Sequence, residues 1–348
     1  MELLELFYEK SLVKSRFLPR KATLPSGQKV VIQGPKYCGK YSFVQYTLQE
    51  QKANALVIDC EDPRYDAQYT KANLANFIQA KNIDTVVFYG IEDFIYSPPV
   101  RTIFVSHHFL PNPYPTLQLH NLDFEEFMLF DKHSDPKVLF NHFLKWGNYP
   151  EISQIPEYKK EKRLWEIYKL TFDQELSIFA QLTFFQGYNT SVYFSYNRLK
   201  NHLKISKDRF YRFFEKLQQD GILFAIPKYG SQRAPKRLFF HDFLAKTLFH
   251  LQKEFPKIFE NMVFLELKDK ELFYLEPLGL YIPKERKIVL SIPFGNEVRI
   301  QNKIEQILAK NRVEVEKIEV VSVGSRFVYE TGSVTCEVLP FYEWAVGR

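Results

Sequence analysis

The chain has 348 residues, a formal net charge of +6, 45% hydrophobic residues and 16% aromatic residues. This is enough apolar sequence for packed cores in two or three domains, and it excludes a disordered chain. The three cysteines, Cys38, Cys60 and Cys336, are too few and too scattered for a disulfide framework and show no metal-ligand spacing.

The N-terminal residues carry acids where a secretory signal would carry lysines. No apolar run approaches the roughly 18 residues that a membrane-spanning helix needs. We therefore expect a cytoplasmic protein without membrane contact.

Five short apolar runs in the first third of the chain predict strands that are buried on both faces of a parallel sheet. Helix-compatible segments, such as 41–51 and 70–81, lie between them. Strands and helices in alternation indicate an α/β sheet. The runs are residues 29–33, 55–59, 85–89, 102–106 and 116–119.

Beyond residue 121 the character changes. The pattern predicts several helices, of which residues 159–180 form the longest. Two further helices, 196–202 and 207–219, are joined by a short turn and followed by two β-like runs at 222–227 and 237–240. Short strands, for example 287–292 and 318–323, alternate through the remainder.

A glycine-rich segment lies between the first strand and a helix. It satisfies the pattern GxxxxGK, in which glycines let backbone N–H groups turn inward around phosphate oxygens and the lysine adds a positive charge. We expect it to bind ATP, with Gly34 and Gly39 shaping the cradle and Lys40 neutralising the β- and γ-phosphates. The expected nucleotide-binding residues are Gly34, Pro35, Lys36, Tyr37, Cys38, Gly39, Lys40, Tyr41 and Ser42.

The segment lacks the usual ligand for the Mg2+ ion that accompanies ATP in such sites. Tyr41 stands where the full motif has a serine or threonine, and its oxygen is a whole ring away from the backbone. Ser42 lies one residue on, about 100° around the helix, and is the candidate metal ligand. The plainer alternative for the whole segment is a glycine turn with a solvated lysine.

Four motifs in order resemble those of archaeal-type AAA+ ATPases that end in a nuclease-like domain of the PD-(D/E)XK type. Residues 34–40 look like that family's GPRxxGKT, 121–127 like PLSFxEF, 146–151 like GGYPE and 260–267 like ENxVxxEL. The resemblance implies a P-loop NTPase sheet with a helical lid, a winged helix-turn-helix and a C-terminal α/β domain. It also implies a homo-oligomer.

The departures from the family concern hydrolysis. The acidic pair of the third strand should fall near Tyr89 and Gly90, where no carboxylate stands. Glu92 and Asp93 follow shortly after and are the candidate catalytic acids; the alternative is that they are surface acids. Ser106 and His107 end the fourth strand where the family has a polar sensor, but the arginine that follows this sensor is absent. The resemblance therefore implies slow ATP hydrolysis or none.

The C-terminal part departs in the same direction. Residues 278–282 and 290–293 stand where nuclease-like members carry acid-rich metal-binding strands. The strand pattern is kept and the metal ligands are lost. We expect a degenerate nuclease-like domain that serves as a scaffold.

Basic residues concentrate in the two-helix segment. Residues 198–237 hold 11 basic and 3 acidic residues, a net charge of 11 − 3 = +8 that exceeds the +6 of the whole chain. Helix, turn, helix and a hairpin with a basic tip are typical of a winged helix-turn-helix, which binds double-stranded DNA through its second helix. A packing module with a solvated basic face is the alternative. The candidate DNA-binding residues are Lys207, Arg209, Arg212, Arg233, Lys236 and Arg237.

Three domains follow from these features. We expect residues 1–155 to form the nucleotide-binding domain, 156–242 the helical and winged-helix domain, and 243–348 the degenerate nuclease-like domain.

Two minor features have plain alternatives. Asp59, Glu61 and Asp62 end the second strand and either hydrate a distant Mg2+ or cap the following turn. His107 and His108 suggest a metal but fit structural loop histidines better.

Overall fold

The computed structural model describes residues 2–11, 19–91, 98–130, 135–332 and 334–347. The chain folds into two compact units. The first unit comprises Met1–Asn121 with two short segments, Tyr149–Glu151 and Gln219–Gly221, and the second comprises the remainder. The three-domain division at residues 155 and 242 is finer than this and stays a prediction.

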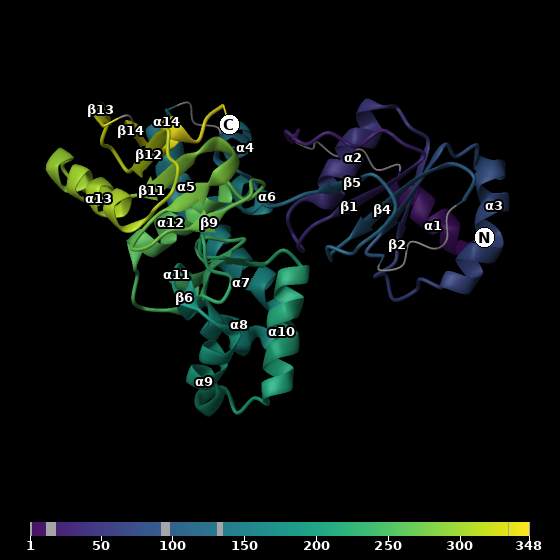
Figure 1. The fold of residues 1–348 in the computed structure, drawn as a ribbon. Coiled ribbons are helices and arrows are strands. Elements are labelled where there is room, and N and C mark those ends of the chain that lie inside the picture. The colour runs from purple at the N-terminus through teal and green to yellow at the C-terminus, as the bar shows by residue number, and fades with distance from the viewer. Residues whose placement is uncertain (1, 12–18, 92–97, 131–134, 333, 348) are drawn as a thin grey trace. The chain divides into compact units, whose positions relative to one another are not determined.

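The first unit is built on a five-stranded sheet in the order β2-β3-β4-β1-β5, and every pairing is parallel (Figure 1). The strand containing residues 29–33 therefore lies inside the sheet, between β4 and β5. All five predicted strands are present, within one residue at either end. Their bounds are β1 (Lys29–Gln33), β2 (Ala55–Asp59), β3 (Thr85–Tyr89), β4 (Arg101–Ser106) and β5 (Thr116–Gln118).

Helices cover both faces of this sheet. Alternate residues of a strand point to opposite faces, so Val31 packs with one buried cluster and its neighbour Ile32 with another. The first cluster includes residues of α1 (Glu2–Ser11) and α3 (Ala67–Lys81), and the second includes residues of α2 (Lys40–Glu50). Helix α1 was not expected from the sequence. The result is a three-layer α/β arrangement that fits a P-loop NTPase fold.

The second unit begins with helices α4 to α8, except that the first two residues of α6, Pro150 and Glu151, belong to the first unit. Residues 159–180, expected as one helix, are divided at Asp173, whose φ of 42° and ψ of −117° break the helical backbone. The bounds are α4 (Phe124–Phe130), α5 (Pro136–Trp146), α6 (Pro150–Gln154), α7 (Glu157–Phe172), η1 (Asp173–Glu175), α8 (Leu176–Leu182) and η2 (Thr183–Phe185).

A helix-turn-helix with a small sheet follows. Helices α9 (Val192–Leu203) and α10 (Lys207–Gln219) flank a turn in which Lys204 adopts a left-handed conformation with φ 47°. Strands β6 (Asn189–Thr190), β7 (Leu223–Ile226) and β8 (Lys236–Phe240) form an antiparallel sheet in the order β6-β8-β7. The buried face of α10 carries Phe210, Phe213, Phe214 and Leu217.

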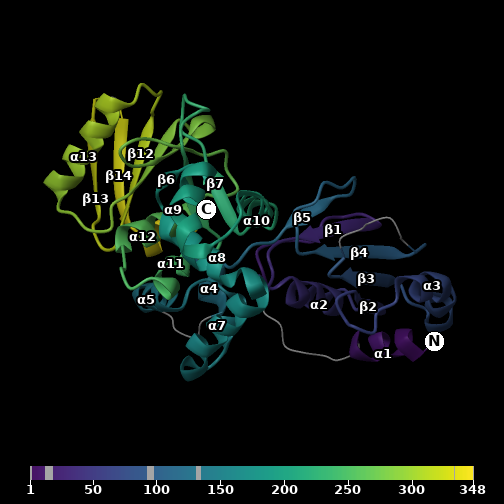
Figure 2. The same cartoon turned by 90° about the horizontal axis from the view of Figure 1, so that it is seen from below.

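The rest of the second unit is a six-stranded mixed sheet in the order β13-β14-β12-β11-β10-β9, with α13 packed along it in both views (Figures 1 and 2). The strands are β9 (Phe273–Tyr274), β10 (Leu280–Ile282), β11 (Lys287–Ser291), β12 (Lys317–Ser322), β13 (Phe327–Thr331) and β14 (Val334–Pro340). The helices are α11 (Ala245–Phe249), α12 (Phe255–Leu265), η3 (Pro283–Glu285), α13 (Glu297–Lys310) and α14 (Phe341–Trp344).

No helix in the described ranges is both long and apolar enough to cross a membrane.

Candidate functional site

The glycine loop leaves β1 at the carboxyl edge of the parallel sheet and runs into α2, which begins at Lys40. The first N–H groups of a helix have no partner within the helix, and the helix dipole makes this end positive. Gly39 has φ 92° and Tyr37 has φ 63°, so the chain turns through two left-handed residues before the helix. The predicted strand–loop–helix geometry is therefore present.

Gly34 is required by a close approach of two backbone segments. A Cβ atom at this position would lie 1.9 Å from the carbonyl oxygen of Leu119, just beyond β5. The Cys38 thiol donates to the same oxygen at 3.2 Å. The loop is thereby held against the chain that follows β5, and any side chain at residue 34 would push the two apart.

Arg20 is a second anchor of the loop that sequence reasoning did not identify. Its guanidinium donates to the carbonyl oxygens of Cys38 and His120, both at 2.9 Å. No motif contains this arginine, and it precedes β1 by an irregular segment. Its position follows only from the tertiary structure.

The lysine of the motif is turned into its own loop. The side chain of Lys40 is 2% exposed, and its ammonium donates to the carbonyl oxygens of Gly34 and Pro35, both at 2.6 Å. The Cys38 sulfur lies 3.8 Å away. Burial lowers the pKa of Lys40. The loop carbonyls therefore hold the charge that the sequence assigns to phosphates.

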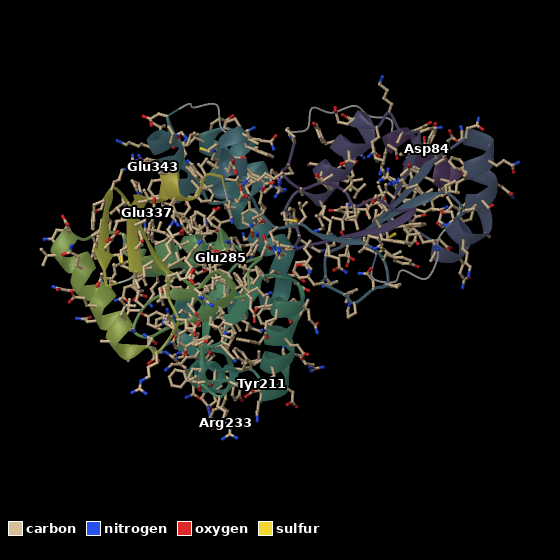
Figure 3. All side chains as sticks on the ribbon, turned by 45° about the horizontal axis from the view of Figure 1, so that its top comes forward. Asp84, Tyr211, Arg233, Glu285, Glu337 and Glu343 are labelled. Atoms are coloured by element: carbon tan, nitrogen blue, oxygen red, sulfur yellow. The ribbon has the colours of Figure 1, made fainter. Side chains whose placement is uncertain are left out.

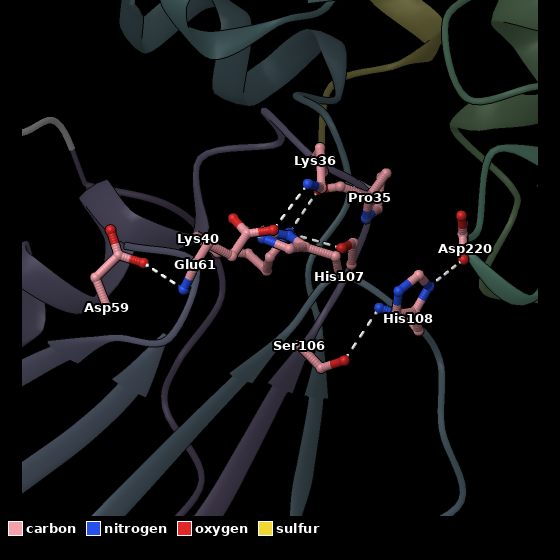
Figure 4. Close-up of polar contacts among 10 residues, drawn as sticks. Pro35, Lys36, Lys40, Asp59, Glu61, Ser106, His107, His108 and Asp220 are labelled. Carbon is pink, nitrogen blue, oxygen red and sulfur yellow. Dashed lines mark hydrogen bonds and ion pairs between the residues drawn. The ribbon is translucent and has the colours of Figure 1, made fainter. Parts of the chain in front are cut away.

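Glu61 joins the loop to two other strand ends (Figure 4). Its carboxylate accepts from Lys36 Nζ at 2.8 Å and from His107 Nε2 at 3.1 Å. Its backbone N–H donates to Asp59 Oδ1 at 3.0 Å, which is the turn cap considered from the sequence. From the sequence, Glu61 could either hydrate a distant Mg2+ or cap a turn. In the structure its carboxylate bridges the glycine loop and the end of β4.

Gly90 makes room for this bridge. The residue follows β3 with φ 75°, and a Cβ atom there would lie 2.6 Å from Glu61 Cγ. Because β3 lies between β2 and β4, the Glu61 side chain has to pass the end of β3 to reach His107. A glycine at this position keeps that path open.

The protonation states in this cluster follow from its contacts. The hydrogen bond from His107, followed by that from Lys36, lowers the pKa of Glu61 to about 2 although burial acts in the opposite direction. Burial lowers the pKa of His107, so its ring is neutral near pH 7. An ionised carboxylate only accepts, so Nε2 carries the proton. The other ring nitrogen, Nδ1, is buried and has no hydrogen-bond partner in the described part of the chain.

The donor set does not fit a magnesium ion. The residue after Lys40 is Tyr41 rather than a serine or threonine, so no short hydroxyl follows the lysine. The Tyr41 side chain is 43% exposed, and its ring packs edge-on against Tyr89 with centroids 5.7 Å apart. Ser42 is partly buried one position further along α2. Within the described ranges no three His, Cys, Asp or Glu side chains form a metal-binding group. The candidate acids Glu92 and Asp93 lie outside the described residues.

The candidate DNA-binding residues divide into two sets. Lys207, Arg209 and Arg212 are exposed on α10. Arg233 is exposed in the β7–β8 turn, at the periphery of the second unit (Figure 3). Lys236 is half-buried. Arg237 is only 3% exposed, so it does not belong to a DNA-facing surface.

Arg237 instead forms a buried ion pair. Its guanidinium donates to Glu260 at 2.7 Å and to Asn189 at 2.8 Å, and it lies over the Tyr274 ring at 4.7 Å. Strand β8 is thereby tied to α12. The alternation of the strand could have indicated this, because Arg237 follows Lys236 directly and must point to the other face.

Comparison with known proteins gives no family. No protein-family model and no curated protein matches the chain. Among solved structures, the RuvB Holliday junction branch migration motor of Thermotoga maritima has 16% identity over 65% of this chain and 87% of its own, with a TM-score of 0.33. A mutant form of the same motor has 15% identity over 65% and 89%, with a TM-score of 0.32. Scores of this size do not define a shared fold.

Proposed function

We propose that the glycine loop binds the phosphates of a nucleotide such as ATP, and that the chain does not hydrolyse it rapidly. The observation that supports this is the position of the loop. It connects an inner strand of a parallel sheet to the start of α2, where ligands of open α/β sheets bind and where a helix end attracts anions.

Lys40 has to exchange partners for this function. Its ammonium leaves the carbonyl oxygens of Gly34 and Pro35 and turns to phosphate oxygens, which form stronger, charge-assisted hydrogen bonds. Lys36 supplies a second cation at the rim of the loop, at present paired with Glu61. The backbone N–H groups of the first turn of α2 complete the cradle.

Slow hydrolysis or none is supported by three features. A tyrosine occupies the place of the magnesium-binding hydroxyl, and β3 ends in Tyr89 and Gly90 rather than in a carboxylate. The Glu61 carboxylate, which is bound to the loop, is already committed to Lys36 and His107. An AAA+-like scaffold that uses nucleotide structurally accounts for this arrangement.

A titration with a fluorescent ATP analogue tests the proposal. We expect saturable binding that Lys40→Ala weakens about ten- to a hundredfold, equivalent to roughly 1.5–3 kcal/mol for a lost charge-assisted contact. Lys71→Ala removes the same charge from α3 and should leave the affinity unchanged. Circular dichroism of each variant verifies the fold. Absence of saturable binding by the wild-type protein would reduce the loop to a structural turn.

A second candidate function is DNA binding by a winged helix. The order of α9, α10, β7 and β8 supports this proposal, as do the exposed cations Lys207, Arg209 and Arg212 on the second helix. The +8 of this segment overstates the free charge. Arg237, Lys228 and Lys216 are paired with Glu260, Glu276 and Glu175.

The salt dependence of binding to random duplex DNA tests this second function. With three or four phosphate contacts, the slope of log affinity against log salt should be about −3 to −4. Arg209→Glu combined with Arg212→Glu should flatten it, whereas Lys162→Glu on the exposed face of α7 should not. Binding that ignores salt and survives the double charge reversal would exclude a DNA-contacting α10.

A further inference from the structure

The glycine loop already holds an anion of its own. Glu61 places one carboxylate oxygen 2.8 Å from Lys36 Nζ and the other 3.1 Å from His107 Nε2. Both donors would otherwise be available to an anionic ligand at the carboxyl edge of the sheet. Glu61 thus engages two donors beside the loop (Figure 4).

This placement is built into the fold. The turn after β2 is capped by Asp59, whose Oδ1 accepts from the Glu61 N–H at 3.0 Å. Gly90 leaves space at the end of β3 that any side chain would fill, since its Cβ would come within 2.6 Å of Glu61 Cγ. The Asp59 cap and the lack of a side chain at Gly90 therefore both direct the Glu61 carboxylate toward Lys36.

The charge beside the loop limits how many phosphates it can neutralise. Lys36, Lys40 and Arg20 contribute three positive charges at the loop, and Glu61 and its cap Asp59 contribute two negative charges, which leaves 3 − 2 = +1. His107 is neutral near pH 7 because burial lowers its pKa. Each further phosphate adds negative charge that this site does not balance.

We infer that Glu61 sets the number of phosphates that the loop accepts, so that the site prefers a nucleoside diphosphate to the triphosphate. This inference rests on the proposed nucleotide binding. A third phosphate competes with Glu61 for Lys36 and for the His107 N–H, whereas a diphosphate held by Lys40 and the first turn of α2 leaves that bridge intact. Removal of the Glu61 charge therefore favours the longer ligand.

The test is a comparison of fluorescent ADP and ATP analogues, titrated in EDTA against three proteins. The wild type should bind the diphosphate more tightly. Glu61→Gln keeps the size and the hydrogen-bonding capacity of the side chain, and it should shift the diphosphate-to-triphosphate affinity ratio at least about tenfold toward the triphosphate. Glu50→Gln is the matched control, because it removes the same charge from the exposed end of α2, about 15 Å from Lys40 along the helix axis.

The outcomes separate the two proposals. Absence of saturable binding of either analogue to wild type and variants overturns nucleotide binding, and the inference falls with it. Equal affinities for both analogues in the wild type would overturn the inference alone. So would a diphosphate-to-triphosphate affinity ratio that is the same in Glu61→Gln as in Glu50→Gln. Thermal melts confirm that each variant is folded at the temperature of the titration.

Discussion

Gly90→Ala should disrupt the Glu61 bridge, and the structure gives the size of the effect. The new methyl group would lie 2.6 Å from Glu61 Cγ, so the carboxylate has to leave Lys36 and His107. A left-handed conformation costs a non-glycine residue about 1–2 kcal/mol. The half-exposed contact to Lys36 contributes roughly 0.2–1 kcal/mol, and the hydrogen bond to the buried His107 contributes roughly 0.5–1.5 kcal/mol. We expect Gly90→Ala to lower the free energy of unfolding by about 2–4 kcal/mol, the sum of these contributions.

A double-mutant cycle separates these contributions. In a Glu61→Ala background the clash is gone, and Gly90→Ala should cost only the conformational term of about 1–2 kcal/mol. Gly230→Ala is a reference for that term alone, because Gly230 has φ 72° and no atom within 4 Å of the added methyl group.

Denaturant unfolding is the assay, with two probes. Trp146, Trp165 and Trp344, the three tryptophans of the chain, all belong to the second unit, so their fluorescence follows that unit. Far-UV circular dichroism follows both units, and a transition seen only by dichroism reports the first. The reasoning is refuted if Gly90→Ala costs the same with and without the Glu61 side chain.

Three further effects should be measurable. Arg237→Met leaves the Glu260 carboxylate buried, with Lys257 3.7 Å away, and should destabilise the second unit by about 3–5 kcal/mol in unfolding followed by tryptophan fluorescence; no loss of stability would contradict the buried pair. The stability contributed by Glu61, whose pKa is lowered from 4.5 to about 2, is present above pH 4.5 and lost as the pH falls toward 2; Glu61→Gln should remove this acid dependence from melting curves. Burial raises the pKa of Asp242 from 3.8 to about 6. The protonated carboxyl therefore contributes fully to the free energy of unfolding below pH 3.8, and this contribution is lost as the pH rises through 6. The difference in stability between wild type and Asp242→Asn should change over that pH range and stay flat above it.

The sheet could be read from the sequence because its strands are buried on both faces. Short runs such as Val30–Ile32 and Val86–Phe88 are apolar throughout, and the glycines and prolines around them limit the helical alternative. The second helix of the helix-turn-helix, Lys207–Gln219, was predicted with its observed bounds because its apolar residues recur with helical spacing. Local pattern was sufficient for these elements.

The site was less accessible, because its contacts join residues far apart in the chain. Lys40 fits the motif, but its burial against Gly34 and Pro35 depends on how the loop closes. Glu61 and His107 are 46 residues apart and meet only through the strand order. Arg237 belongs to a basic run whose other members are exposed or half-buried, and its partner Glu260 lies on a later helix.

The ammonium of Lys40 acts as an internal brace for the loop. Because two carbonyl oxygens of the loop are already satisfied by this side chain, the cradle keeps its curvature without help from outside. Any ligand of the loop has to displace the Lys40 ammonium from these two carbonyl oxygens, and part of the ligand's binding free energy is used for that exchange. Occupancy should therefore raise the melting temperature of the first unit only slightly, and guests should leave quickly.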